Sequence, residues 1–78
     1  MIIRYFAGAA EAAGRTEQPH DGGLTVSALK AQLSGEYGTE FARVLTCCSV
    51  LVDGTRATDD TFAPTGATVD VLPPFAGG

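Results

Sequence analysis

The sequence predicts a small α+β domain in which one sheet packs against one main helix. The chain has 78 residues, and a domain of this size buries only about 60% of the surface that its unfolded chain exposes. Apolar and polar residues alternate near both ends, as in half-buried strands, whereas one central stretch repeats apolar residues at helical spacing. So thin a core leaves little volume for a deep active-site cavity, which favours a binding or carrier module over a self-sufficient enzyme.

The first twenty residues predict a strand, a short helix and a second strand. Met1–Phe6 alternates, and Arg4 marks the even-numbered face as the one in water. Ala7–Ala13 is rich in alanine and is followed by a glycine, which is typical of a short helix with a glycine stop. Pro19 removes a ladder hydrogen bond, so the second strand, Arg15–His20, is confined to an edge or an end.

The main helix is predicted to begin after Leu24, which follows the turn Asp21–Gly23. Thr25 is a good N-cap, because its hydroxyl can accept a hydrogen bond from a backbone N–H of the first turn. One face then carries apolar side chains at spacings of three and four: Val26, Leu29, Leu33 and Tyr37. Gly35 and Gly38 weaken the end of this helix, and Glu40–Leu45 fits a further short helical turn.

The last third predicts a hairpin, a loop and a final strand. Ser49–Val52 is a strand, and because Asp53–Gly54 is a strong hairpin signal, Thr55–Ala57 is its short return strand. Asp59–Gly66 is expected to be a loop. Thr68–Leu72 alternates again, and the two prolines after it cannot donate ladder hydrogen bonds, so the sheet ends there.

The charge balance argues against nucleic acid as a partner. Five Lys and Arg against nine Asp and Glu give a net charge of −4, and the basic residues are scattered, whereas a phosphate backbone needs several cations on one face. The uncharged runs Val44–Val52 and Thr61–Val69 are each about half the ~20 residues of a membrane span. Met1–Arg4 lacks the basic-then-apolar order of a signal peptide. We therefore expect a cytoplasmic protein that binds neither nucleic acid nor a membrane.

The usual catalytic and metal-binding constellations are missing from the sequence. Cys47 and Cys48 are adjacent, so they do not readily form a disulfide, and no second pair completes a zinc site. We interpret them as small side chains in or beside a strand, with a redox role as the alternative. His20, beside a proline, and the vicinal Asp59 and Asp60 are interpreted as solvated loop residues. We expect no metal site and no cofactor bound by this chain.

Chemistry is suggested only at the C-terminus. Residues 1–72 are expected to form the folded domain, and residues 73–78 a flexible tail that ends in Gly77–Gly78. Pro73–Pro74 would hold this tail away from the sheet, and two glycines have no side chains to hinder passage through a narrow channel. A terminal α-carboxylate on such a tether is a handle that a partner enzyme can activate.

The tail sequence Val71-Leu72-Pro73-Pro74-Phe75-Ala76-Gly77-Gly78 strongly resembles the ubiquitin-like sulfur carriers, in particular the small subunits of molybdopterin synthases. The opening Ile3–Ala7, the alanine-rich turn that closes at Gly14, and Val50–Gly54 are also similar to that family. Asp53 is a departure, since the family often has Asn there, but both residues suit the turn.

The resemblance implies the β-grasp fold, with a mixed sheet of about five strands packed on one main helix plus short helices. It implies that an ATP-dependent activating adenylyltransferase and sulfurtransferase adenylates the Gly78 carboxylate, which then becomes a covalent thiocarboxylate. The tail, with Phe75, Ala76 and Gly77, would carry that sulfur into the large subunit of molybdopterin synthase, in a heterotetramer. There it would attack a pyranopterin precursor of the molybdenum cofactor. The chain would then be no enzyme on its own, because the large subunit supplies the catalytic pocket and ATP belongs to the activating enzyme.

Strand alternation and the implied fold together predict a partner-binding patch around the outlet of the tail. Phe6 shares its strand face with Arg4, and Leu72 shares its face with Asp70, so both large apolar residues lie on faces suited to water. In a β-grasp fold the first and last strands are neighbours. The expected patch consists of Phe6, Leu72 and Phe75, with Arg56 at its border.

Other functions remain open at this point. A carrier for thiamine or cysteine synthesis would use the same thiocarboxylate with a different recipient. A ubiquitin-like protein modifier would join Gly78 to a lysine of a target protein, and the single Lys30 of this chain does not decide the matter. A plain interaction module would contain Gly77–Gly78 incidentally.

Overall fold

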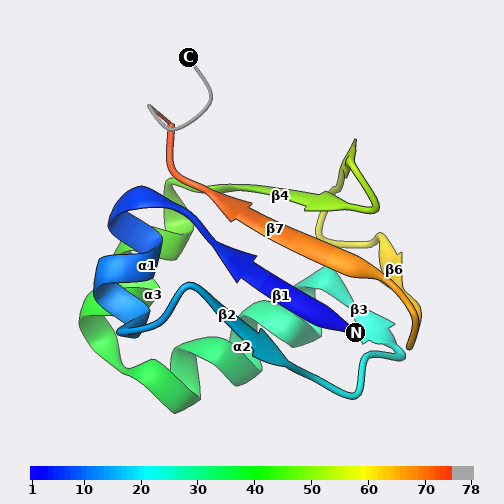
Figure 1. Ribbon diagram of the computed structural model, residues 1–78, viewed down its shortest axis with the longest axis horizontal. Helices are drawn as coiled ribbons and strands as arrows, with labels where there is room; N and C mark the ends of the chain where they lie inside the picture. Colours follow the sequence, from blue (N-terminus) through cyan, green and yellow to red (C-terminus); the bar gives the residue numbers. More distant parts are fainter. Residues whose placement is uncertain (75–78) are drawn as a thin grey trace.

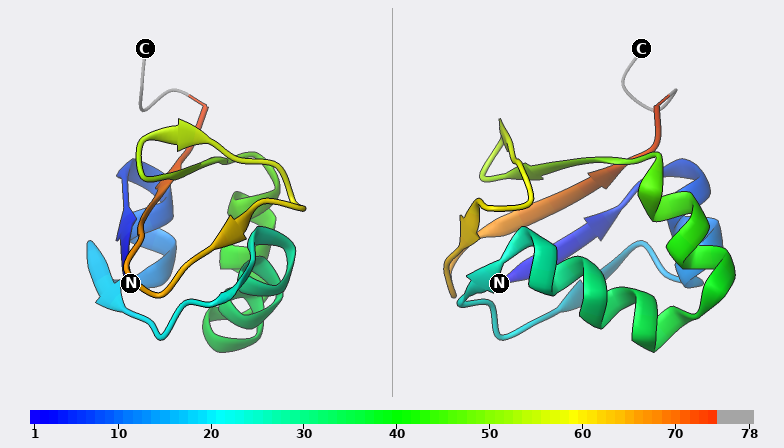
Figure 2. Two further views of the ribbon diagram at one scale, coloured as in Figure 1. Left: turned by 90° about the vertical axis from the view of Figure 1, so that its right-hand side faces the viewer. Right: turned by 180° about the vertical axis from the view of Figure 1, so that it is seen from behind.

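The structure, a computed structural model, describes residues 1–74 of the chain. Its elements, in chain order, are β1 (Ile2–Tyr5), α1 (Ala7–Ala13), β2 (Glu17–Pro19), β3 (Leu24–Thr25), α2 (Val26–Tyr37), α3 (Thr39–Thr46), β4 (Ser49–Val52), β5 (Thr55–Arg56), β6 (Phe62–Ala63) and β7 (Thr68–Leu72). Five strands form a mixed sheet in the order β2-β1-β7-β4-β5, and β3 pairs with β6 in a separate ribbon. The sheet curves around the helices, and α2 and α3 lie on one side of it (Figures 1 and 2).

The first and last strands lie side by side at the centre of the sheet. β1 and β7 pair in parallel over four residues, from Ile2 with Thr68 to Tyr5 with Val71. β2 and β4 flank this pair, and both are antiparallel to their neighbours. Pro19 lies on β2, at the edge of the sheet, as the sequence predicts. The β-hairpin of β4 and β5 is also confirmed, and its turn residues Asp53 and Gly54 have φ values of 50° and 81°.

The inner face of the sheet and the helices enclose one core. Strand residues that are buried in it include Ile3, Tyr5, Val50, Val69 and Val71, and helix residues include Val26, Leu29, Leu33, Phe41 and Leu45. The rings of Tyr5, Tyr37 and Phe41 contact one another in this core, with centroids 5.0–5.9 Å apart. Val69 and Val71 therefore lie on the inner face, as predicted.

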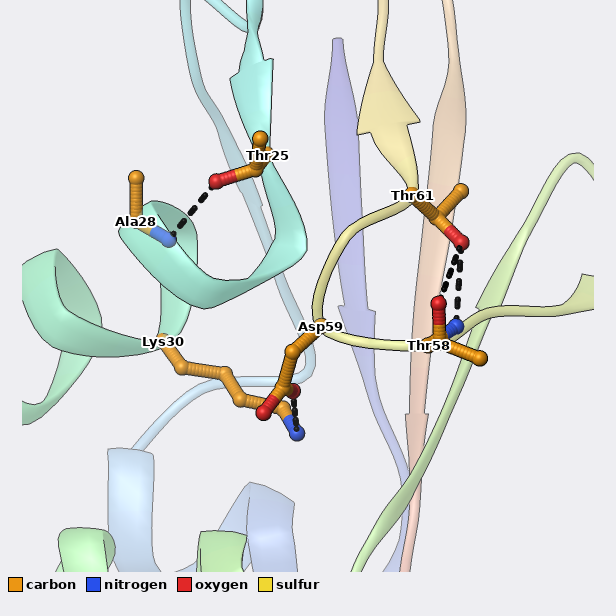
Figure 3. Close-up of polar contacts among 6 residues, drawn as sticks. All are labelled: Thr25, Ala28, Lys30, Thr58, Asp59 and Thr61. Atoms are coloured by element: carbon orange, nitrogen blue, oxygen red, sulfur yellow. Dashed lines mark hydrogen bonds and ion pairs between the residues drawn. The ribbon is translucent and has the colours of Figure 1, made fainter.

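Local chemistry sets the ends of the helices. Gly14 ends α1 in the left-handed conformation, with φ of 75°, and its N–H donates to the carbonyl of Ala10 at 2.8 Å. Thr25 caps α2, because its Oγ1 accepts from the N–H of Ala28 at 3.2 Å (Figure 3). Gly35 does not interrupt α2, which ends only at Gly38.

The prediction of a loop over Asp59–Gly66 is wrong for Phe62–Ala63, because these two residues form β6 and pair with β3. The segment before β6 is attached to α2: the first two N–H groups of the helix donate to the carbonyls of Thr61 and Asp59. The Asp59 carboxylate also contacts Lys30, with Nζ–Oδ1 2.8 Å (Figure 3). Asp59 is thus a structural residue of this connection, although its side chain remains largely exposed.

None of the helices within residues 1–74 has the length and apolar character that crossing a bilayer requires.

Gly22 allows its backbone to lie close to the backbone of Pro64 and Thr65, and the stability of the fold should depend on this contact. Its φ is +73°, and a Cβ atom there would lie 2.9 Å from the Pro64 carbonyl oxygen and from the Thr65 Cα. Gly23 has nearly the same φ, +72°, but its Cβ would meet only the Thr65 side chain at an ordinary 3.7 Å. Gly23→Ala should lower the free energy of unfolding by about 1 kcal/mol, the cost of left-handed backbone. Gly22→Ala should cost about 1–3 kcal/mol more, since backbone must also move.

Urea denaturation of both variants and the wild type measures this difference, with Gly23→Ala as the matched control. Equal losses of unfolding free energy in the two variants would contradict the close approach of Gly22 to Pro64 and Thr65.

Candidate functional site

The candidate site lies on the outer face of the five-stranded sheet, which turns away from the helices. Burial alternates along β1, where Ile2 and Arg4 are exposed and Ile3 and Tyr5 are buried. The strand register places one outward-facing row across all five strands: Glu17, Arg4, Asp70, Leu51 and Arg56. Along this row, the charge alternates from Glu17 through Arg4 to Asp70. Leu51, the single apolar residue of the row, lies between Asp70 and Arg56.

Arg4 and Asp70 form a two-point ion pair at the centre of this row. The Arg4 Nε lies 2.6 Å from Asp70 Oδ1, and Nη2 lies 2.9 Å from Oδ2. The Asp70 side chain is only 10% exposed, whereas the Arg4 side chain is 49% exposed. The hydrogen bond and charge of Asp70 raise the pKa of Arg4 further above its usual value. Asp70 was expected on a face open to water; it does lie on the outer face, but the arginine and the neighbouring strands cover it.

Phe6 and Leu72 directly follow Tyr5 and Val71, which are the last paired residues of β1 and β7. The Phe6 N–H donates to the carbonyl of Val71 at 3.2 Å, so Phe6 lies beside the end of β7. Phe6 is 37% exposed, and Leu72 is half-buried. The Arg4 guanidinium carbon lies 5.9 Å from the centroid of the Phe6 ring, within the range of a cation–π contact.

Arg56 approaches the same place from the opposite edge of the sheet. Its Nη2 donates to the Ser49 hydroxyl at 3.1 Å, and Ser49 is the register partner of Leu72. The guanidinium therefore points along the sheet from β5 toward the end of β7. The structure thus brings Phe6, Leu72 and Arg56 to one end of the outer face, and it adds Arg4, which the sequence reasoning missed. These four residues are called the outlet patch below.

The tail begins at this end of the sheet, where Pro73 and Pro74 follow β7 (Figure 1). Four of the predicted site residues, Phe75, Ala76, Gly77 and Gly78, lie outside the described residues.

A signal for Arg4 was present in the sequence. Arg4 and Asp70 carry opposite charges at the same position of two strands that the implied fold makes neighbours.

The remaining candidates have structural explanations. The His20 Nδ1 accepts from the Gly22 N–H, and its Nε2 contacts the Gln32 Oε1, both at 2.8 Å, so this half-buried ring holds a turn and is not simply solvated. Cys47 and Cys48 are free thiols between α3 and β4, in agreement with small side chains beside a strand. Burial raises the pKa of the Cys48 thiol, which lowers its reactivity. Within residues 1–74, no group of His, Cys, Asp or Glu side chains is arranged to hold a metal ion.

The comparisons with known proteins agree with this fold. The model of the ThiS family matches residues 3–78. The crystal structure of SAMP1 from Haloferax volcanii is 28% identical, with a TM-score of 0.78 over 100% of this chain and 98% of that one. The solution structure of the Haloferax volcanii HVO 2177 protein is 27% identical, with a TM-score of 0.75 over 99% of this chain and 84% of that one. None of the curated proteins matches the chain.

A further solved structure is named a putative molybdopterin converting factor, subunit 1, from Pyrococcus furiosus. It is 22% identical, with a TM-score of 0.80 over 94% of each chain, so it bears on the fold alone. Together these likenesses confirm the ubiquitin-like β-grasp fold that the sequence predicts.

The outlet patch generates a prediction about the two faces of β7. Val69 is fully buried in the core, so Val69→Ala should lower the free energy of unfolding by about 2 kcal/mol. Leu72 lies on the outer face and is half-buried, so Leu72→Ala should cost about 1 kcal/mol or less. Thermal and urea unfolding of the two variants compares them directly. A Leu72→Ala protein as unstable as Val69→Ala would show that Leu72 belongs to the core.

Proposed function

The chain belongs to the ThiS family of ubiquitin-like sulfur carriers, and on that premise we propose that it is the sulfur carrier subunit of molybdopterin synthase. The observation that carries this assignment is the tail sequence Leu72–Gly78, which resembles the small subunits of that enzyme. The likeness in fold to the putative molybdopterin converting factor subunit of Pyrococcus furiosus is compatible with it. We place the chain and its partner proteins in the cytoplasm.

The proposed chemistry begins at the terminal carboxylate. An oxygen of the Gly78 carboxylate attacks the α-phosphorus of an ATP held by the activating enzyme, and pyrophosphate leaves. The resulting mixed anhydride has a good leaving group. Sulfide (HS⁻) supplied by the activating system attacks the carbonyl carbon, AMP departs with the electron pair of the broken C–O bond, a proton is lost, and a thiocarboxylate results. The carrier itself supplies only the carboxylate and its tether, and it binds no cofactor.

In the second stage, the loaded tail enters the large subunit of the synthase. The thiocarboxylate sulfur attacks a carbon of a pyranopterin precursor and displaces an oxygen leaving group, and water then cleaves the resulting thioester, which leaves the sulfur on the precursor and regenerates the Gly78 carboxylate. The large subunit, in a heterotetramer, supplies the pocket and the acid–base groups. The architecture of the carrier supports this division of labour. The hollow of about 500 Å³ between β2 and α2 is a shallow one, and its His20 and Gln32 already bond to each other. The folded part of the chain is thus suited to presenting the tail.

The outlet patch fits a docking role for the same partners. Phe6 and Leu72 expose apolar surface beside the first residues of the tail. A partner that contacts Phe6 and Leu72 would lie next to the first residues of the tail and could bind the tail directly. Exposed apolar groups of this kind, ringed by polar residues, are typical of binding surfaces.

A second candidate is a ubiquitin-like protein modifier, in which Gly78 is joined to a lysine of another protein. It is favoured by the likeness to the small archaeal modifier protein 1 of Haloferax volcanii, which is 26% identical over 95% of this chain. The intact mass of the protein from its own cells distinguishes the two. A thiocarboxylate adds the mass difference between sulfur and oxygen, whereas conjugation adds a whole protein.

Deletion of Gly78 tests the proposed chemistry. The truncated protein should unfold at the wild-type temperature, because the residue lies beyond the last strand, yet it should neither be adenylated nor accept sulfur. ATP–pyrophosphate exchange with the activating enzyme measures the first step, and intact mass measures the second. If the truncated chain still accepted sulfur, for instance on Cys47 or Cys48, the terminal mechanism would be wrong.

Leu72→Ala tests the docking role in a protein that is expected to remain folded. A central aliphatic anchor costs about 2 kcal/mol or more when it is truncated, which corresponds to a loss of affinity of roughly 30-fold. Calorimetric titration of the variant into the activating enzyme should show a loss of at least that size. Normal binding by a folded Leu72→Ala protein would remove Leu72 from the docking surface.

A further inference from the structure

The hollow between β2 and α2 contains a hydrogen-bond donor that has no acceptor. Gln18 lies in the middle of β2, and only 6% of it is exposed. Its Oε1 accepts from the hydroxyls of Tyr5 and Tyr37, but within residues 1–74 its Nε2 amide group has no hydrogen-bond partner. Every side-chain nitrogen or oxygen that is sealed from solvent in this part of the chain has a partner, so the unbonded Nε2 must be open to solvent. It opens into the hollow, which Gln18 lines.

The two tyrosines fix which way the Gln18 amide points. Burial raises the pKa of Tyr5, so its hydroxyl keeps its proton and needs an acceptor. If the amide were turned over, at least one of the two hydroxyl protons would have no acceptor among residues 1–74, which is costly where the hydroxyl is buried. Two donated hydrogen bonds also polarise the amide and make its N–H groups stronger donors. The inner end of the hollow is therefore a fixed donor that a ligand oxygen would satisfy.

The rim of the hollow is negatively charged. Asp21 lies on it in the turn before β3, Glu36 lies on it in α2, and no lysine or arginine of residues 1–74 lines it. Neither carboxylate has an ion-pair partner within that part of the chain. The ring of His20 is bonded at both nitrogens, to the Gly22 N–H and to Gln32, so it forms a wall. A ligand that fits this hollow thus combines an acceptor oxygen at the inner end with a positive group at the rim.

The open edge of β2 favours a peptide as that ligand. β2 is the outermost strand of the main sheet (Figure 1). In its antiparallel pair with β1, the His20 N–H donates inward, to the Met1 carbonyl. By the alternation of such a ladder, the backbone groups of Glu17 and Pro19 face the open side. Arg15 Nε occupies the Glu17 carbonyl at 3.1 Å, and proline has no N–H, which leaves the Glu17 N–H and the Pro19 carbonyl. An extended backbone offers a carbonyl and an N–H to match them, as in strand addition to a sheet edge, whereas a simple ammonium ion has no carbonyl.

We propose that this hollow is a second binding site of the domain, which takes an extended segment of a partner protein that carries a lysine or arginine. A backbone carbonyl of the segment accepts from the Gln18 amide, and its basic side chain lies between the carboxylates of Asp21 and Glu36. The segment runs along the open edge of β2. The charge of the rim also gives selectivity, because an acidic segment is repelled at the same place. The inference does not depend on the proposed function, since it uses none of the tail residues.

This site lies at the other end of the sheet from the tail. Pro19 pairs with Ile2, which in turn pairs with Thr68 at the start of β7. The tail follows Leu72, at the end of β7. The length of β7 separates the two ends by roughly 13 Å, at about 3.3 Å per residue. A segment bound in the hollow therefore leaves the outlet patch uncovered, so one partner can hold the domain while another protein acts on the tail.

The test titrates two capped tripeptides into the isotope-labelled full chain at low salt and follows the NMR spectrum. One peptide has lysine between two threonines, and the other has glutamate in place of the lysine. The lysine peptide should shift the side-chain amide of Gln18 and the backbone amide of Glu17 in a saturable manner. The glutamate peptide should bind at least about fivefold more weakly, because its charge is repelled at the rim. The backbone amides of Phe6 and Leu72 should not move.

Two variants that each remove one carboxylate test the role of the rim. Glu36→Gln removes a rim charge, and at low salt it should raise the Kd of the lysine peptide about threefold, the size expected of an exposed charge pair. Glu11→Gln makes the same change on α1, outside the hollow, and should change the Kd by less than about 1.5-fold. Both side chains are exposed, so both variants should keep the wild-type melting temperature within a few degrees. Raising the salt should reduce the difference between them, because exposed charges are screened.

The inference would be wrong if the Gln18 amide did not move, if both peptides bound equally, or if Glu11→Gln weakened binding as much as Glu36→Gln. A butylammonium salt is the probe for a simple cation, and an equal, saturable shift of Gln18 by this salt would mean that the hollow binds a cation and no peptide. These outcomes are independent of the tail. ATP–pyrophosphate exchange with the activating enzyme reports on Gly78 whether or not the hollow binds a peptide.

Discussion

The parallel pairing of β1 with β7 is the interaction on which the rest of this structure depends. It joins the first strand of the chain to the last, over the register from Ile2 and Thr68 to Tyr5 and Val71. Every other strand of the main sheet is attached outward from this pair, and the helices cover its inner face. Because the pairing closes nearly the whole chain into one loop, its entropic cost is large, and many buried contacts must offset it.

The two faces of this central pair have separate roles. On the inner face, Tyr5 packs against Phe41, and its hydroxyl donates to the Gln18 Oε1 at 2.5 Å. The same oxygen accepts from Tyr37, so one amide of an edge strand ties β1 to the end of α2. Burial raises the pKa of Tyr5, which therefore remains a hydrogen-bond donor. These contacts stabilise the domain from the inner face, and the proposed docking residues lie on the outer face.

The same pairing also places the proposed docking residues beside the start of the tail. Phe6 and Leu72 are far apart in sequence, yet each directly follows the last paired residue of its strand. The proposed docking site and the start of the tail are thus one place. In the proposed function, docking at this place brings the tail to the partner protein.

The sequence by itself determined the elements that depend on neighbouring residues. Alanine followed by glycine predicted α1, the threonine cap and apolar spacing predicted α2, and Asp53–Gly54 predicted the hairpin, since each signal acts within one or two turns of chain. It also placed Phe6 and Leu72 on the outer face by alternation. Tertiary structure alone decided the two-residue pairing of β3 with β6, the burial of Asp70 under Arg4 and the reach of Arg56 to Ser49. The physical reason is that the first two of these contacts join segments distant in sequence, and the third depends on the side-chain conformation of Arg56 across a hairpin. A two-residue strand or a single side-chain contact produces no periodic pattern in the sequence.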